Sequence, residues 1–288
     1  MLLRETGFTY GGKHSRDDMG LLYAEKDGHI AIPEIKRNSY SIAGMNGTVL
    51  LPGEAWQTFN LEGTLYPARE PRTQAQAQAL LRKVAAWLTA GRQQLIFDYE
   101  PAVYYLAELN QASKWSLRNW FGGELPIRWT AQPFAYSVDE TSNSTTTTGT
   151  SASLTLALDT GQPAPLKLTV ENTGSATITR VSTGGITLDG LNLTAGRTLV
   201  INSEPPVGAV IGSQNALPYA TAFMPAMLQA GSNAISVALS YGSSSGRSAK
   251  ITASARGRWE ATSRAHIGCA PAKLPRGPEP RGSRPGRW

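Results

Sequence analysis

Apolar and polar residues alternate in short runs along the first half of this chain, and turn-forming residues separate the runs. Residues 59–66 (Phe-Asn-Leu-Glu-Gly-Thr-Leu-Tyr) alternate with a period of two, which is the pattern of a half-buried β-strand. Residues 94–98 form another strand candidate. Asn46-Gly47, between two apolar runs, predicts a tight hairpin. The pattern therefore predicts a β-sheet in residues 1–138.

A helical period marks one stretch of this half. Thr73 suits the N-cap position before it, and Gly91 suits the position just after the last helical residue. The sequence therefore predicts one helix over residues 73–90, packed on the sheet as an α+β unit. Three- and four-residue intervals, which give a helix one apolar stripe, separate Ala77, Leu80, Leu81, Val84, Ala85 and Leu88.

The second half has the pattern of many short strands. Runs with a strict period of two recur between residues 152 and 260, and glycine-containing turns separate them. Such spacing predicts an antiparallel β-sandwich over residues 152–260. Before it, residues 139–151 hold a Ser/Thr-rich run without an apolar anchor, which predicts a linker or a long exposed hairpin. The fold class expected for the whole chain is therefore mainly β.

The distribution of charge sets the last segment apart. The chain of 288 residues has a formal net charge of +6. Residues 261–288 hold six basic residues against Glu279, so most of the positive excess belongs to this Pro/Arg/Gly-rich end. It lacks the apolar spacing of a folded element, and we expect it to be disordered. Because residues 1–260 are almost neutral, nucleic acid is an unfavoured partner.

The sequence has no pattern of secretion or membrane insertion. No apolar run reaches the ~18 residues of a membrane-spanning helix. Residues 1–10 carry Arg4 and Glu5 and lack the apolar core of a signal peptide. Cys269 is the single cysteine, which excludes an internal disulfide and a cysteine-cluster metal site. We therefore expect assembly in a reducing cytoplasm and no membrane partner.

Patterns of catalytic chemistry are likewise missing from the sequence. Gly242–Gly246 has the letters of a nucleophile elbow, but it lies between two predicted strands rather than between a strand and a helix. We interpret Asp98 and Glu100 as a solvated turn rather than as the carboxylate pair of a glycosidase. We therefore predict no catalytic residue, no metal site, no cofactor and no enzymatic activity. The histidines, which lack a second ligand at metal-binding spacing, are His14, His29 and His266.

One group of candidate contact residues lies near the N-terminus. Phe8 and Tyr10 belong to a predicted strand, and Gly11 and Gly12 form the turn that follows it. We interpret this strand and turn as an exposed edge that seeks a neighbouring subunit, because unpaired strands are templates for pairing. The sequence therefore predicts a subunit interface at Phe8, Tyr10, Gly11 and Gly12.

A second group consists of tryptophans. Trp115 and Trp120 lie in a stretch that also contains Lys114 and Arg118. Tryptophan has a large apolar body and one polar group, and it is enriched in protein interfaces. We interpret Trp115 and Trp120 as residues that contact a partner protein.

Several of these segments carry a family resemblance. In the first half they are residues 8–15, 20–21, 44–47, Gly63, the helix Ala77–Leu88 with Gly91, and residues 95–101 and 104–107. In the second half they are residues 172–174, 205–206 and 228–235. Over roughly residues 1–258 the chain resembles the distal tail proteins of siphophages, the phages with long non-contractile tails. The Ser/Thr-rich run and the basic end depart from the family pattern.

The resemblance implies a structural virion protein. Its first domain would form a homohexameric ring, and a galectin-like β-sandwich would project outward from that ring. As the hub of the baseplate, the ring would connect the tail tube protein to the tail-associated lysin or fibre hub protein, with the receptor-binding protein as a further partner. The implied location is the tail tip of the virion, assembled in the cytoplasm of the host bacterium. The implied role is in tail assembly and host attachment.

A carbohydrate-binding module for receptor recognition is the alternative function, because galectin-like sandwiches bind sugars on one face. A sugar site requires an exposed aromatic platform with a few converging polar groups. The predicted sandwich contains Tyr219, Phe223 and Tyr241 as its aromatic residues before Trp259. This sparse set favours an adaptor role over sugar recognition.

Overall fold

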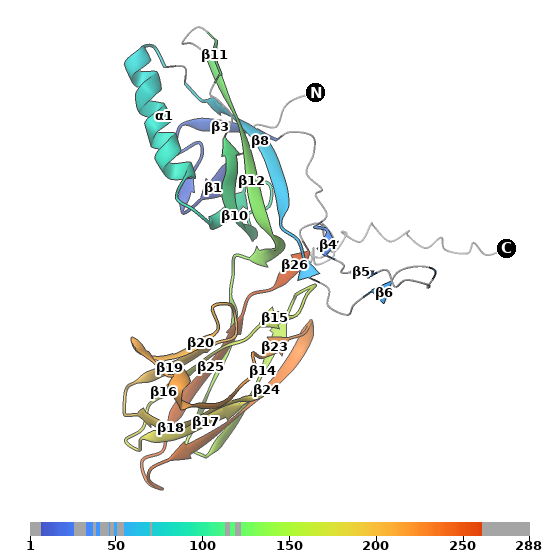
Figure 1. The fold of residues 1–288 in the computed structure, drawn as a ribbon. Coiled ribbons are helices and arrows are strands. Elements are labelled where there is room, and N and C mark those ends of the chain that lie inside the picture. The colour runs from blue at the N-terminus through green and yellow to red at the C-terminus, as the bar shows by residue number, and fades with distance from the viewer. Residues whose placement is uncertain are drawn as a thin grey trace, which may run out of the picture.

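The computed structural model describes residues 7–25, 33–36, 39–40, 46, 49–50, 55–69, 71–112, 116–118 and 122–260. These residues fold into two bodies that lie end to end (Figure 1). One is a curved sheet with a helix on one face, and the other is a β-sandwich. The mainly-β class predicted from the sequence is confirmed. Among the described residues, no helix has the length and apolar character needed to cross a membrane.

A nine-stranded antiparallel sheet forms the first body. Its main order is β2-β1-β9-β10-β12-β8-β3, and both β11 and β26 pair with β12 outside this path. The strands are β1 (Phe8–Tyr10), β2 (Lys13–His14), β3 (Leu21–Glu25), β8 (Phe59–Pro67), β9 (Gln93–Phe97), β10 (Val103–Ala112), β11 (Ser116–Arg118), β12 (Gly122–Ser137) and β26 (Arg258–Glu260).

Two short antiparallel pairs accompany this sheet. β4 (Ile35–Lys36) pairs with β7 (Ala55–Trp56), and β5 (Ser39–Tyr40) pairs with β6 (Val49–Leu50). The β5–β6 pair flanks the hairpin predicted at Asn46-Gly47, although Gly47 lies outside the described residues.

The helix α1 (Gln74–Leu88) covers one face of the sheet (Figure 1). The hydroxyl of Thr73 accepts a hydrogen bond from the backbone N–H of Gln76 at 3.2 Å, so Thr73 is the N-cap that the sequence predicted. Gly91 follows the helix with a φ of 81°, a left-handed conformation that glycine adopts without steric cost. The apolar stripe faces the sheet, and Trp87 is almost fully buried there. The predicted helix is therefore confirmed.

Aromatic side chains fill the space between α1 and the sheet. The rings of Phe8 and Trp87 are stacked, with centroids 5.4 Å apart. Tyr10 contacts Trp129 at 4.5 Å between centroids, and the indole Nε1 of Trp87 donates a hydrogen bond to the backbone oxygen of Tyr10 at 2.8 Å. Large aromatic side chains dominate the energetics of a core because each buries a large apolar area. This cluster fixes the helix against β1 and β12.

The second body is a sandwich of two antiparallel sheets. One sheet has the order β13-β25-β16-β19-β20-β21, and the other has the order β14-β24-β17-β18-β22. Leucine, isoleucine and valine side chains from both sheets meet in one core. The elements are β13 (Thr141–Thr147), β14 (Ser151–Leu158), β15 (Ala164–Pro165), β16 (Lys167–Asn172), β17 (Ile178–Thr183), β18 (Ile186–Leu193), β19 (Thr198–Asn202), β20 (Gly208–Ile211), β21 (Gln214–Asn215), the 3₁₀ turn η1 (Leu217–Tyr219), β22 (Ala220–Phe223), β23 (Met227–Leu228), β24 (Gly231–Tyr241) and β25 (Ala249–Ala255).

The Ser/Thr-rich segment 139–151 belongs to this sandwich, so of the two predicted alternatives, a linker and a long exposed hairpin, the linker is wrong. All of β13 pairs antiparallel with β25, and β14 begins in the opposite sheet at Ser151. The side chain of Asn143 donates a hydrogen bond to the backbone oxygen of Thr155 in β14 at 2.7 Å. Threonine is β-branched and favours the extended backbone, so a threonine run without apolar residues suits an edge strand that faces solvent.

The C-terminal boundary predicted for the sandwich also differs from the structure. Residues 258–260 form β26 and pair with β12 of the first sheet, with Phe134 opposite Glu260 and Tyr136 opposite Arg258. The chain thus leaves the first sheet through β12, builds the sandwich, and returns to the same strand (Figure 1). Three residues are too short a run for periodicity to show which sheet they join.

We expect the substitution Gly63→Ala in β8 to destabilise the first body. A Cβ atom at Gly63 would lie 2.2 Å from the ring of Tyr23, which is fully buried. Displacing that ring costs about 1–3 kcal/mol of unfolding free energy. Urea unfolding followed by circular dichroism and tryptophan fluorescence measures the change. Gly208→Ala in β20 is the control, because a Cβ there meets no atom within 4 Å. Equal stability of the two variants would contradict this account of Gly63.

Candidate assembly surface

The structure places Phe8 and Tyr10 in the core rather than at a surface. Both side chains have no exposed area, and β1 has a partner strand on each side, β2 and β9. The predicted exposed strand with a subunit contact at Phe8 and Tyr10 is therefore contradicted. The side chains of the three residues in β1 are buried, half-buried and buried in turn. Two large apolar residues that are two positions apart fit a strand packed under a helix as well as an exposed edge strand, which explains the error.

Gly11 and Gly12 do lie at the surface. They form the turn between β1 and β2, with φ values of 57° and 76°, and both residues are exposed. The backbone N–H of Gly11 donates a hydrogen bond to the oxygen of Gln94 at 3.1 Å, which ties the turn to β9. Gly11 and Gly12 remain predicted contact residues, and the positive φ values give a reason for glycine at both positions.

The predicted contact residues Trp115 and Trp120 lie outside the described residues. The strands around them are described: β11 pairs with the start of β12, with Ser116 opposite Glu124 and Leu117 opposite Gly123. Partner contact at Trp115 and Trp120 stays a prediction.

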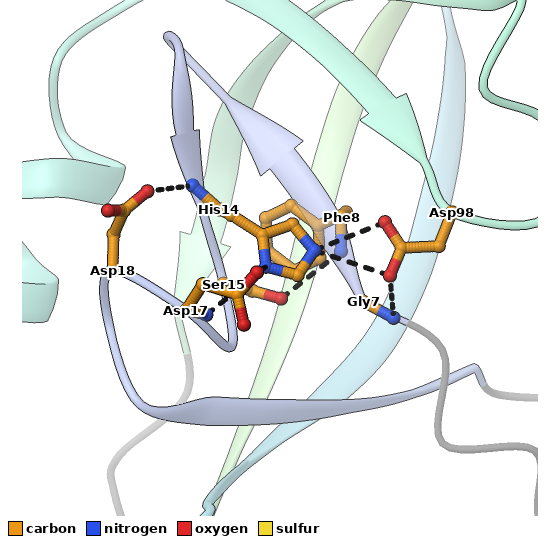
Figure 2. Close-up of polar contacts among 7 residues, drawn as sticks. All are labelled: Gly7, Phe8, His14, Ser15, Asp17, Asp18 and Asp98. Carbon is orange, nitrogen blue, oxygen red and sulfur yellow. Dashed lines mark hydrogen bonds and ion pairs between the residues drawn. The ribbon is translucent and has the colours of Figure 1, made fainter.

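A polar clamp beside the β1–β2 turn was not predicted from the sequence. The ring Nδ1 of His14 accepts a hydrogen bond from the backbone N–H of Asp17 at 3.1 Å. With Nδ1 as acceptor, the neutral ring carries its proton on Nε2, which lies 3.2 Å from Oδ1 of Asp98 (Figure 2). Asp98 also accepts a hydrogen bond from the backbone N–H of Gly7 at 2.9 Å. The clamp thus joins the entry to β1, β2 and the end of β9.

Close packing around Gly7 requires glycine at this position beside the clamp. A Cβ atom there would lie 2.5 Å from Oδ2 of Asp98 and 2.7 Å from Nε2 of His14. The backbone at residue 7 therefore approaches the clamp as only glycine allows. His14 and Asp98 are 84 residues apart in sequence, so spacing alone gave no signal for their contact.

The candidate carboxylates are bound to neighbouring groups of the same chain. Asp98 is engaged by Gly7 and His14, and Glu100 accepts a hydrogen bond from the hydroxyl of Tyr105 at 3.1 Å. Within the part of the chain that the structure describes, no group of three or more His, Cys, Asp or Glu side chains is arranged to hold a metal ion. The Gly242–Gly246 segment joins β24 to β25, so it lacks the helix that a nucleophile elbow requires.

Hydrogen bonds from the sandwich reach β26 at the junction of the two bodies. The hydroxyl of Thr160 donates to the backbone oxygen of Arg258 at 2.8 Å, and the backbone N–H groups of Gly161 and Gln162 donate to the same oxygen at 3.0 Å. The guanidinium of Arg258 lies over the ring of Phe134 in β12, 4.7 Å from its centroid. Because burial disfavours the charged guanidinium, the pKa of Arg258 is lowered. These contacts join the sandwich to the first sheet in addition to the two connections through the chain.

Glu140, on the segment that connects β12 to β13, also contributes contacts to the junction. Glu140 accepts a hydrogen bond from the hydroxyl of Ser254 at 2.5 Å, and Lys167 and Arg256 lie 3.7 and 3.8 Å away. The hydrogen bond from Ser254 is the main cause that lowers the pKa of Glu140 below its ordinary value of 4.5. Both cations act in the same direction, whereas partial burial opposes them.

A pocket of about 180 Å³ opens at this junction. It is smaller than the roughly 300–1,000 Å³ of a typical small-molecule site, and it does not support a sugar or cofactor site. We interpret it as a packing gap between the bodies. Its lining residues are Ala102, Val103, Ser137, Thr141, Asp159, Gly257 and Trp259.

We expect Asp98→Ala to lower the unfolding free energy by about 1 kcal/mol, because the N–H of Gly7 and the ring of His14 lose their acceptor. Asp98→Asn keeps an oxygen for Gly7 and is expected to cost less. Urea unfolding measures both variants, with Glu124→Ala as the control because Glu124 is an exposed carboxylate on β12. If the asparagine variant were as unstable as the alanine variant, the acceptor role for Gly7 would be wrong.

Glu140→Gln is expected to remove a small, pH-dependent stabilisation of the junction. The lowered pKa of Glu140 means that its contribution is present above the ordinary value of 4.5 and is lost as the pH falls through the folded-state value. The wild type should therefore exceed the variant by less than about 1 kcal/mol at pH 7, and the difference should vanish in acid. Thermal unfolding from pH 2 to 7 tests this, with the exposed neighbour Asp139→Asn as control. A difference that grows in acid would reverse the assigned sign.

Comparison with known proteins adds information on the fold. No protein-family model matches the sequence, and comparison with curated proteins gives no match. Among solved structures, the Dit protein (gp 19.1) of phage SPP1, described as a paradigm of the hub adsorption apparatus in phages that infect Gram-positive bacteria, is similar with a TM-score of 0.63. That match has 13% sequence identity and covers 88% of this chain and 99% of the SPP1 chain.

A second solved structure has the same fold at lower similarity. A chain in the structure of the phage p2 baseplate, in its activated conformation with Sr, matches with a TM-score of 0.51 and 9% identity. The match covers 86% of this chain and 97% of that one. The likeness to the SPP1 and p2 chains extends over both bodies, and this chain therefore has the fold of the phage Dit protein.

Proposed function

We propose that this chain is a distal tail protein, the ring at the baseplate hub of a long-tailed phage. The observation that supports this best is the extent of the structural match, which covers 88% of this chain and 99% of the SPP1 Dit protein. A match of that extent cannot be confined to one of the two bodies. Because fold alone does not determine function, the proposal also needs support from surfaces.

The proposed ring is a homohexamer built from the first body. A cyclic ring requires two different surfaces on each subunit that meet head to tail. The nine-stranded sheet ends in two different edges, the short β2 with its glycine turn and the longer β3, and these two ends suit such a contact. The sandwich, attached at the far end of the first body, would then lie outside the ring.

The proposed partners follow from this position in a tail. The ring would contact the tail tube protein on one side and the tail-associated lysin or fibre hub protein on the other, and the receptor-binding protein is a further partner. The location is the tail tip of the virion, and assembly takes place in the host cytoplasm. The role is structural rather than enzymatic, which agrees with the engagement of Asp98 and Glu100 in contacts within the chain.

The mass of the full chain in solution tests the ring. The chain has a mass of 30.8 kDa, and light scattering at several protein concentrations should give six times this mass or a multiple of it. The measurement is repeated in 1 M salt, which screens non-specific association of the basic end. Negative-stain electron microscopy of the same sample should show six-fold rings. A monomer at every concentration and salt would sink the proposed ring.

A further inference from the structure

One long segment of the sandwich has no charge. Residues 205–246 contain no Asp, Glu, Lys, Arg or His, whereas the segment is bounded by Glu204 and Arg247. It includes the elements from β20 to β24; of these, β22 is the strand at the end of its sheet, whereas β24 lies inside the same sheet. Surfaces of soluble proteins usually mix charges of both signs. The lack of charge on β22 and on the residues that flank it therefore asks for an explanation.

The two sides of the sandwich are closed differently. On one side, β13 and β14 run against each other, and the hydroxyl of Thr147 donates a hydrogen bond to the backbone oxygen of Ser151 at 3.0 Å. On the other side, β22 ends its sheet and pairs with β18 alone among the described strands. A strand at the end of a sheet presents unpaired N–H and C=O groups. β22 is therefore an open edge.

Apolar side chains flank this open edge. Met224 is 67% exposed and Tyr219 is 41% exposed, one at each end of β22. Thr221 and Ala222, between them, are exposed as well. Natural edge strands are commonly protected by lysine or by an inward-pointing charge, and β22 has neither. Its protection is limited to its length of four residues and a bulge opposite β18.

The sequence around β22 is symmetric. Pro218 and Pro225 stand at equal distances from the midpoint between Thr221 and Ala222. A proline cannot donate a hydrogen bond to a ladder, so the two prolines limit any added pairing to the residues between them. Two antiparallel copies of this segment, centred on that midpoint, would each place a proline at the end of the other copy's strand. The segment is thus complementary to itself.

We propose that β22 pairs with β22 of a second copy of this chain, antiparallel and across a two-fold axis. In this register Thr221 lies opposite Ala222 of the partner subunit. Met224 then lies at the same end of the ladder as Tyr219 of the partner subunit, a pairing that favours a sulfur–aromatic contact. The two sheets become one continuous sheet through the edge.

The symmetry of the segment explains why a second copy is the occupant. Most of the net charge of +6 lies in residues 261–288, and residues 1–260 are almost neutral, so charge does not keep two copies of the sandwich apart. The segment 205–246 that contains β22 has no charged residue, so this edge neither repels a second copy nor attracts an anionic partner such as nucleic acid. The contact goes beyond the proposed ring and uses a different body of the molecule.

Sedimentation equilibrium of the full chain tests the pairing. We expect Ala222→Lys, which adds a charge to the open edge, to halve the mass at high protein concentration. The mass of the wild type should be twice that of Ala222→Lys whether the wild type is a pair of rings or a pair of single chains. Failure of the ring and failure of the pairing are therefore distinguishable. Met224→Ser, at a residue that is 67% exposed, should shift the same equilibrium toward the smaller species without the added charge.

Ala238→Lys is the matched control, because Ala238 is exposed on β24 but has a paired strand on each side, with Ser151 of β14 opposite it on one side and Ser182 of β17 on the other. It should keep the mass of the wild type. Circular dichroism of each variant confirms that the sandwich is folded. An unchanged mass for folded Ala222→Lys would overturn the proposal. An equal loss in Ala238→Lys would assign the contact to the face of the sheet and would overturn edge pairing as well.

Discussion

A sandwich that followed β12 through one peptide connection would be free to rotate about it. The chain avoids this freedom by returning to the strand that it left, so that β26 pairs with β12 after the sandwich is complete. The backbone oxygen of Arg258 then accepts hydrogen bonds from three groups of the loop 160–162. Two covalent connections and a shared set of hydrogen bonds thus restrict rotation of one body against the other.

Polar and aromatic groups, rather than aliphatic side chains, are concentrated at this junction. The rings of Tyr104 and Tyr136 are stacked there, 5.4 Å between centroids, and burial raises the pKa of both hydroxyls. Arg258 has a buried Nε without a hydrogen-bond partner, a cost that its position over Phe134 partly offsets. Such groups tolerate fewer alternative arrangements than leucine or valine, and they make the angle between the bodies specific.

Local features of the chain were predictable, and long-range pairings were not. Thr73 and Gly91 bracket α1 because caps act within a few residues, and the period of two located most strands. The position of β26 depends on a strand more than a hundred residues earlier, and no local pattern encodes it. Phe8 and Tyr10 were misassigned for a related reason: alternation shows that one face of β1 is apolar, but α1 decides whether that face is covered.

The junction also influences where the open edge β22 of each subunit lies in an assembly. In a symmetric ring of identical subunits, every β22 would point in an equivalent direction. Two rings that meet across two-fold axes would then form all their edge contacts together or none of them. A ladder of four residues is weak by itself, but simultaneous contacts multiply its effect. In the proposed tail ring, which would join a polar tail on one face, this pairing would be exchanged for contacts with other tail proteins.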